Sequence, residues 1–230
     1  MLVEDVELGE GLSATRLRLA ERACLARLVV VDRGPWREPR TTPALRQGFG
    51  LLLLSGLLSR RVALGGRFGA ELLGPGDLLR PWDDPSEHAA MPFATDWRVI
   101  QPVRLAVLDS HFAARAGPYP EISAKLISRA VMRARRFAAT MAIVHEPRIR
   151  ARVQMLLWTL AERWGKVRPD GVALALPLTH ALLADMVAAS RPAVTDAISA
   201  LSERGSLQRD RDLWLLRGGP PPGLGATGQD

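Results

Sequence analysis

The sequence contains a single cysteine and lacks any long apolar run. Cys24 cannot form an intramolecular disulfide or build a thiolate-ligated cluster from this chain alone, so we expect a buried structural thiol. Apolar runs such as residues 51–54 are far shorter than the roughly 20 residues that a membrane-spanning helix needs. The N-terminus carries no signal-peptide pattern. These absences predict a reduced, cytoplasmic protein with no membrane partner.

Histidines are also few, and their spacing argues against an enzyme. His88, His111, His145 and His180 lie 23, 34 and 35 residues apart, whereas a cupin metal site needs two closely spaced histidines. No Ser-His-Asp arrangement or phosphate-binding loop is present either. His88 or His111 could serve as an axial ligand for haem, but a lone histidine is far more often structural or exposed. We therefore expect no catalytic residue, metal or cofactor. A cupin-like metalloenzyme is the weakest alternative.

Positive charge is abundant and unevenly placed. The chain has 31 Lys and Arg residues against 24 Asp and Glu residues. Residues 129–168 include ten basic and only two acidic side chains. A basic surface attracts a phosphate backbone and releases counterions on binding. The alternative is a solvated helix face in an arginine-rich sequence, so the cluster supports nucleic-acid binding without establishing it.

The N-terminal half reads as a β domain. Residues 1–24 contain an acidic stretch followed by a short helix over 14–23. From 25 to 108 the chain alternates between short apolar segments and turns rich in Gly and Pro, with clear turn signals at 65–66 and 74–77. This spacing predicts a β-sandwich or barrel, a jelly-roll-like unit. The expected strands fall within 25–31, 49–54, 57–64, 68–73 and 97–108.

The pattern changes to helical after Pro120. Apolar residues recur every three or four positions for about 23 residues, which is long for one helix in a small domain. We expect this stripe to pack against a second copy of the chain, and the alternative is packing onto the β domain. The predicted interface residues are Ile122, Leu126, Ala130, Phe137, Met141 and Val144. Pro147 ends the helix, and another follows over 148–164.

Residues 179–205 have the pattern of a helix-turn-helix. Thr179 is a suitable N-cap for a helix whose apolar face includes Leu183 and Val187. Ser190 caps a second helix, whose Pro192 falls in the first turn and whose stop is Gly205. In this motif the outward face of the second helix enters the major groove of DNA. DNA binding is the leading interpretation, although similar helical hairpins occur in domains with no such role.

A small β-hairpin follows the second helix. Residues 207–209 and 213–216 can pair around the turn Asp210-Arg211-Asp212, and a hairpin at this place is a wing. Residues 218–230 are rich in Gly and Pro and have almost no core-forming side chains, so we expect a flexible tail.

The run 187–195 (VAASRPAVT), with Leu178-Thr179 and Leu183-Ala184 before it, resembles the signature of the Crp/Fnr family of bacterial transcription regulators. The segment 73–77 (LGPGD) is a weaker match to the Gly-Asp turn of the family's sensor roll. The resemblance implies an α+β fold. It implies an N-terminal β-roll over 1–118, a dimerisation helix over 119–146, a winged helix-turn-helix over 147–217 and a tail over 218–230.

The resemblance also implies DNA contacts. Arg191 matches the recognition-helix arginine that reads a guanine, since its planar fork suits O6 and N7 together. Ser190 and Thr179 match positions near helix N-termini that contact phosphates. The predicted contact set is Thr179, Ser190, Arg191, Pro192, Thr195, Asp196 and Ser199.

Two residues depart from the family pattern. Asp196 stands where the family commonly has Arg or Lys, so it either accepts a hydrogen bond from cytosine N4 or is repelled by phosphate and points away. This places the usual recognition sequence in doubt. Ala188 replaces the usual turn glycine, at a cost of roughly 1 kcal/mol if the backbone is strained there.

The sensor roll lacks the cassette that holds a cyclic nucleotide. After Asp77 the sequence LLRPWDDPSEHAAMPF has neither the Gly-Glu pair for the ribose nor the Arg beside small residues for the cyclic phosphate. Asp83 and Asp84 stand where a phosphate would be repelled. We therefore expect a regulator that does not respond to cyclic AMP. Its implied partners are double-stranded DNA, a second copy of the chain and RNA polymerase. The main alternative is a ligand- or protein-responsive sensor whose winged domain contacts proteins.

Overall fold

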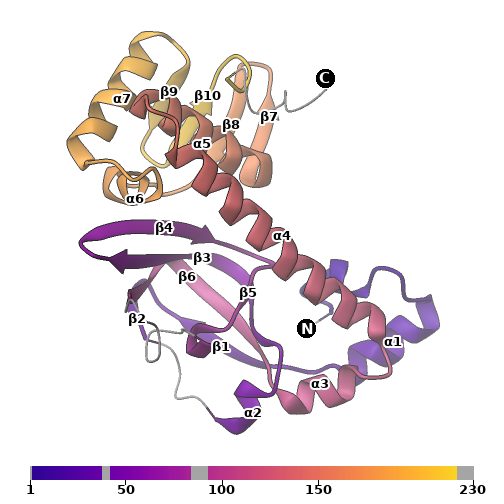
Figure 1. The fold of residues 1–230 in the computed structure, drawn as a ribbon. Coiled ribbons are helices and arrows are strands. Elements are labelled where there is room, and N and C mark those ends of the chain that lie inside the picture. The colour runs from indigo at the N-terminus through magenta and orange to yellow at the C-terminus, as the bar shows by residue number, and fades with distance from the viewer. Residues whose placement is uncertain (1, 38–41, 84–92, 222–230) are drawn as a thin grey trace, which may run out of the picture. The chain divides into compact units, whose positions relative to one another are not determined.

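A long antiparallel sheet dominates the N-terminal part of the computed structural model, which describes residues 2–37, 42–83 and 93–221 (Figure 1). The chain divides into two units. The first contains Met1–Gly65 and Glu71–Arg136, and the second contains Gly66–Ala70 and Phe137–Asp230. Secondary structure is mixed, so the predicted α+β class is confirmed.

The sheet of the first unit has six strands, and its path runs β1-β6-β3-β4, with β2 paired to β6 and β5 paired to β3. The segments 49–54 and 57–64 form one strand, because Gly56 at φ 89° bends the chain without ending it. Pro102 lies within β6 opposite this bend, where the β3–β6 register is irregular and its missing N–H is tolerated. The strands are β1 (Arg27–Val31), β2 (Gly34–Trp36), β3 (Gly50–Leu64), β4 (Arg67–Leu73), β5 (Leu78–Leu79) and β6 (Ala94–Leu108).

Several helices precede, interrupt or follow these strands in the sequence. The predicted helix over 14–23 is confirmed as α1, which Ser13 caps by accepting from the backbone N–H of Arg16. Cys24 is fully buried, and burial raises the pKa of its thiol, as expected for a structural residue. The helices are η1 (Val6–Gly9), α1 (Ala14–Ala23), α2 (Pro43–Arg46), η2 (Pro81–Asp83), α3 (Ser110–Ala116) and α4 (Pro120–Val144).

The start of α4 is buried within the chain. Ile122 and Leu126 are fully buried in a cluster with Leu8, Cys24 and Phe112. They therefore have no exposed surface to offer a second copy, contrary to the interface role predicted for them. The reason is that α1, α3 and the N-terminal segment cover this turn of the helix, which the periodicity of α4 alone does not reveal.

The second unit has its own helices and a four-stranded sheet in the order β7-β8-β10-β9. The helix after Pro147 and the wing hairpin appear where the sequence predicts them, whereas the hairpin β7–β8 was not predicted. Trp214 of β10 is fully buried, and its indole N–H donates to the Leu176 carbonyl at 3.1 Å. The elements are α5 (Ile149–Trp164), β7 (Gly165–Arg168), β8 (Gly171–Ala175), α6 (His180–Met186), α7 (Arg191–Glu203), β9 (Leu207–Asp210) and β10 (Leu213–Leu216).

None of the helices in the described part of the chain is long and apolar enough to cross a membrane. The predicted tail is described only over 218–221, and its remainder, 222–230, lies outside the described residues. His88 and Asp84 lie outside them as well.

Candidate nucleic-acid interface

The helix-turn-helix consists of α6, a short turn and α7. Thr179 Oγ1 accepts from the N–H of Leu182 at 3.1 Å, and Ser190 Oγ accepts from that of Ala193 at 3.4 Å. Both residues are therefore N-caps, as the sequence predicts. Because each hydroxyl accepts with its oxygen, its hydrogen stays available to a phosphate outside the protein. Gly205 at φ 69° follows the end of α7, where it closes the helix.

Each helix of the motif buries one face and exposes the other. Leu183 and Val187 of α6, and Val194 of α7, are fully buried, and α7 packs against both α5 and α6. Most of the predicted contact residues are on the opposite face of α7. Pro192, Asp196 and Ser199 are exposed there, Thr195 is half-buried beside them, and Arg191 is exposed at the N-terminal end of the helix. The structure thus leaves the predicted recognition residues of α7 at least partly accessible.

The turn between the helices is supported from α5. Ala188 has φ 50°, in the left-handed region that glycine favours, which agrees with the strain expected for an alanine there. Arg152 of α5 donates to the carbonyls of Val187 and Ala188 at 3.2 and 3.3 Å. Its Nε also donates to the Glu146 carbonyl, in the segment that joins α4 to α5. Sequence reasoning missed Arg152, because these contacts join residues distant in the chain.

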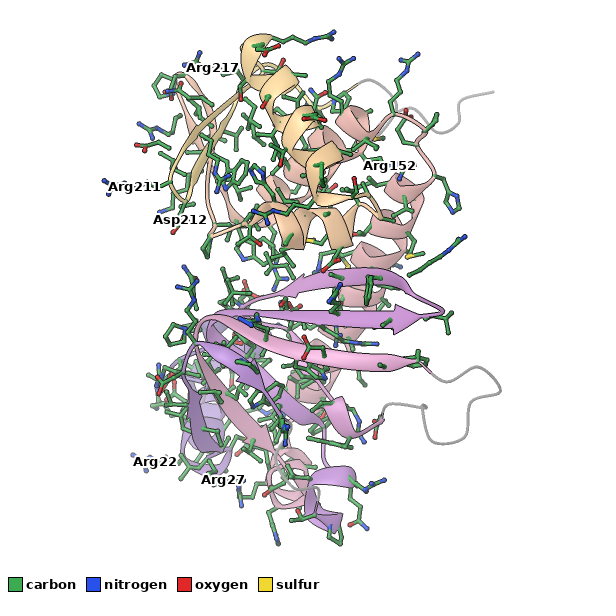
Figure 2. The ribbon with its side chains drawn as sticks, turned by 90° about the vertical axis from the view of Figure 1, so that its left-hand side faces the viewer. Arg22, Arg27, Arg152, Arg211, Asp212 and Arg217 are labelled. Carbon is green, nitrogen blue, oxygen red and sulfur yellow. The ribbon has the colours of Figure 1, made fainter. Side chains whose placement is uncertain are left out.

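The wing is a two-stranded hairpin with charged residues at its tip. Arg211 (φ 51°) and Asp212 lie at the tip between β9 and β10, and both are exposed (Figure 2). Arg217 donates to Gln208 at 2.9 Å across the two strands. Arg209 lies over the Trp214 ring at 4.3 Å, so its guanidinium is held against the body of the domain.

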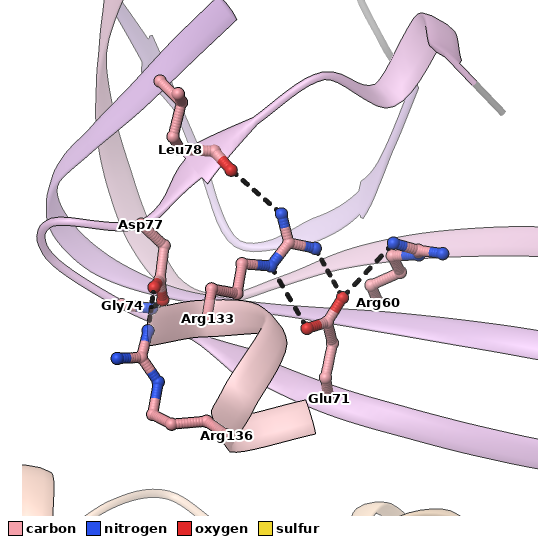
Figure 3. Close-up of polar contacts among 7 residues, drawn as sticks. All are labelled: Arg60, Glu71, Gly74, Asp77, Leu78, Arg133 and Arg136. Atoms are coloured by element: carbon pink, nitrogen blue, oxygen red, sulfur yellow. Dashed lines mark hydrogen bonds and ion pairs between the residues drawn. The ribbon is translucent and has the colours of Figure 1, made fainter. Parts of the chain in front are cut away.

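Part of the basic cluster does not belong to this surface. Arg129, Arg133 and Arg136, three arginines of α4, pair with carboxylates of the first unit. Figure 3 shows two of them: Arg133 donates to Glu71 at 2.6 Å, and Arg136 donates to Asp77 at 2.6 Å. Their charge is neutralised locally, so the positive charge available to DNA is smaller than the count over 129–168 indicates.

The Gly-Asp turn of the roll is one of these ion-paired sites. Asp77 is almost fully buried, and its Oδ2 accepts from the N–H of Gly74 at 2.9 Å while Oδ1 accepts from Arg136 (Figure 3). The carboxylate therefore holds the turn closed and links it to α4. Its role here is structural.

The first unit also contains a cavity of about 320 Å³. Three arginines contribute to it, and Arg60 lies over the Trp97 ring at 5.7 Å. Glu71 accepts from both Arg60 and Arg133, which fixes two of these charges (Figure 3). The lining residues are Arg60, Leu78, Arg80, Pro81, Asp83, Trp97, Ala130 and Arg133.

Within the described ranges, no three His, Cys, Asp or Glu side chains cluster as a metal site would require. Of the histidines, His111 and His145 are exposed, and His180 stands half-buried at the start of α6.

Comparison with known proteins agrees with this geometry. Residues 151–217 match the model of the Crp-like helix-turn-helix domain. A search of curated protein sequences finds no match to the chain.

Solved structures resemble the whole fold at low identity. A cyclic nucleotide-binding domain containing protein from Listeria monocytogenes EGD-e is 12% identical, with 87% of this chain and 95% of that chain covered and a TM-score of 0.67. FixK2 from Bradyrhizobium japonicum is 18% identical, with coverages of 84% and 93% and a TM-score of 0.62. A transcriptional regulator of the CRP/FNR family from Thermus thermophilus is 22% identical, with coverages of 84% and 94% and a TM-score of 0.55.

The domain match includes α6, the turn, α7 and the wing. The structural matches extend over most of the chain. Residues 151–217 therefore form a Crp-like helix-turn-helix domain, and the chain has the fold of the Crp/Fnr transcription regulators.

Proposed function

We propose that this chain is a sequence-specific DNA-binding transcription regulator that acts as a homodimer on a near-palindromic operator. The observation that carries the proposal is the outward face of α7, where Arg191 stands exposed in the first turn. Its fork can donate to guanine O6 and N7 together, a contact worth about 1–3 kcal/mol of discrimination between bases. The N-caps Thr179 and Ser190 supply hydroxyls for phosphate contacts at the same end of the motif.

Selection from random duplexes, followed by one substitution, tests this proposal. The purified protein should enrich a sequence made of two related half-sites. Arg191→Ala should lower affinity for that operator by about tenfold or more and relax preference at one base pair of each half-site. Arg22→Ala, which removes an exposed arginine from α1, is the control and should change neither property. A protein that enriches no sequence would contradict the proposal.

The dimer is proposed on α4. Its exposed residues Ile127, Val131 and Met141 are 60%, 46% and 47% accessible, although all three are large and apolar. Together with Ala134 and Ala138 they follow a spacing of four and three residues, which is the seam of a two-stranded coiled coil. Phe137, one of the residues predicted from sequence, is exposed beside this seam at 47%. We propose that a second copy covers this face.

We propose that the regulator does not respond to cyclic AMP. Arg80 and Pro81 follow the Gly-Asp turn closely, where the family's cyclic-nucleotide binders carry their Gly-Glu pair. Cyclic AMP should therefore give no binding heat and should leave operator affinity unchanged. RNA polymerase is the protein partner we propose for the DNA-bound regulator.

A ligand-responsive sensor is a second candidate role for the first unit, and the cavity favours it. Arg60, Arg80 and Arg133 outnumber the two acidic side chains at this site, Glu71 and Asp83, and Trp97 adds an aromatic wall. Such a lining suits a small anion with an apolar part. Calorimetry with aromatic carboxylates, on wild type and on Arg60→Met, would test it. Binding heat that persists unchanged in the variant would contradict it.

A further inference from the structure

His180 joins three elements of the DNA-binding domain. It is the first residue of α6, and both of its ring nitrogens have partners. Nδ1 lies 2.8 Å from Oγ1 of Thr195 on α7, and Nε2 lies 2.7 Å from a terminal nitrogen of Arg209 on β9. One imidazole therefore bridges the recognition helix and the wing.

The chemistry of the partners fixes the direction of each hydrogen bond. A guanidinium only donates, so Nε2 of His180 must accept from Arg209 and the ring must be uncharged. The remaining hydrogen is then on Nδ1, which donates to Thr195 Oγ1. The Thr195 hydroxyl in turn donates to the carbonyl of Arg191 at 3.1 Å. These consecutive hydrogen bonds thus connect Arg209 of the wing to the first turn of α7.

Contacts with other residues of the domain hold Arg209 in place. Besides its position over the Trp214 ring, it donates to the Leu178 carbonyl at 3.4 Å and to the Arg211 carbonyl at 3.1 Å. Trp214 is fully buried and hydrogen-bonded, so the surface under the guanidinium cannot shift easily. Through His180 and Thr195, the fixed Arg209 of β9 therefore holds the backbone of Arg191 in position. The proposed function places the side chain of Arg191 against a base edge.

We propose that His180 is a specificity-determining positioning residue, which aligns the first turn of the recognition helix with the wing only while its imidazole is uncharged. The inference rests on the proposed function. A protonated ring carries hydrogens on both nitrogens, so Nε2 can no longer accept from Arg209 and instead repels it.

The charges around the ring favour the uncharged form. Burial lowers the pKa of His180, and the positive charges of Arg209 on β9 and Arg191 on α7 lower it further. At neutral and alkaline pH the ring is uncharged and the bridge is complete. As the pH falls through the lowered pKa, the ring becomes charged and the bridge is lost. The first turn of α7 is therefore aligned with the wing at neutral and alkaline pH.

Loss of the bridge should affect specificity more than general affinity. A charged histidine adds a positive group near the DNA, which helps phosphate binding at any sequence. The alignment of Arg191 matters only where a base is read. The ratio between affinity for the selected operator and affinity for a scrambled duplex should therefore fall on acidification, even where affinity for the scrambled duplex rises.

The experiment measures this ratio for the full-length protein at constant ionic strength, from pH 8 down to the pH at which nitrogen chemical shifts show the His180 ring to be protonated. For wild type we expect a fall of roughly tenfold, the size of one lost base contact. His180→Gln keeps an acceptor for Arg209 but cannot be protonated, so its ratio should stay near the high-pH value throughout. His180→Ala should show the reduced ratio at every pH. His145→Gln, which removes an exposed histidine, is the matched control and should behave as wild type.

Nitrogen chemical shifts of the ring provide a readout without DNA. We expect the Nδ1–H tautomer at pH 8, and a protonated Nε2 at that pH would overturn the inference. Two outcomes would overturn this inference and leave the proposed function standing. They are a wild-type operator preference that stays constant while the ring becomes protonated, and a His180→Gln variant that still loses preference in acid. A wild type with no operator preference at any pH would instead overturn the proposed function, and this inference with it.

Discussion

At the scale of single residues, position 188 concentrates the backbone strain of the turn. A non-glycine residue at φ 50° destabilises the folded state by about 1–2 kcal/mol, and glycine avoids that strain. Glycine also has more conformational entropy in the unfolded state, which lowers the stability of the fold by roughly 0.5–1 kcal/mol. Ala188→Gly should therefore stabilise the DNA-binding domain by about 0.5–1 kcal/mol, which denaturant unfolding can measure. Ala189→Gly, next to it but without a positive φ, should destabilise by a similar amount. Equal effects at both positions would contradict this account.

Asp196 is the residue that most distinguishes the reading face. It is exposed on α7, as Arg191 is, five residues further along. Its negative charge opposes phosphate, so Asp196→Asn should raise affinity for a scrambled duplex by about fivefold at low salt, close to 1 kcal/mol. If Asp196 accepts a hydrogen bond from cytosine N4, the operator should gain less, because Asp196→Asn weakens that contact. Binding to both duplexes over a salt series measures the ratio, and an unchanged ratio would mean that Asp196 reads no base.

Local signals in the sequence predicted much of this site. The caps Thr179 and Ser190, the stop at Gly205 and the exposed set around Arg191 all follow from spacing within one helix or one turn. Arg152 and His180 could not be found in this way. Their partners lie 15 to 36 residues away, and such contacts depend on how the elements pack.

At the scale of elements, α4 has different faces with different roles. The three-to-four spacing predicted a long helix correctly, but it did not show which apolar residues the chain covers by itself. Ile122 and Leu126 are buried at its start, whereas Ile127 and Val131 are exposed a fraction of a turn away. Arg129 and Arg133 belong to the basic cluster that favours DNA binding in the sequence, yet both pair with carboxylates of the first unit. The apolar periodicity of α4 shows which residues share a face of the helix, but it does not show what covers that face.

One ion pair fastens the N-terminal segment to α4. Arg129 pairs with Asp5, and both side chains are only 12% exposed. Arg129→Met would leave the carboxylate of Asp5 without its partner in a poorly hydrated place, so we expect a loss of roughly 3 kcal/mol of unfolding free energy. Arg135→Met removes an exposed arginine of the same helix and should cost less than about 0.5 kcal/mol. Denaturant titration of both variants checks the difference, and equal losses would contradict the assigned role.

At the scale of the whole molecule, the two units have separate cores. The first is built from clusters around Trp97 and Phe112, and the second surrounds Trp214. We therefore expect scanning calorimetry to resolve two transitions. Arg129→Met should lower the transition of the first unit only, and Ala188→Gly should raise that of the second only. A single transition that both variants shift would show that the units unfold together.

The proposed dimer depends on the apolar seam of α4. Val131→Glu places a charge in the middle of the apolar seam of α4, where two copies would bring like charges together. We expect a monomer at micromolar concentration by analytical ultracentrifugation, with a native fold by circular dichroism. Leu19→Glu adds the same charge at an exposed leucine of α1 and should leave the wild-type mass.

The same variants test how DNA is read. Two recognition helices in successive major grooves need half-sites whose centres are about 34–36 Å apart, one turn of the duplex. Wild type should therefore lose most of its affinity when roughly half a turn is inserted between the half-sites, because the second half-site then faces away. The Val131→Glu monomer should bind the intact and the lengthened operators equally weakly, since it engages one half-site at a time. A monomer that still discriminates between the two spacings would refute the dimeric mode of reading.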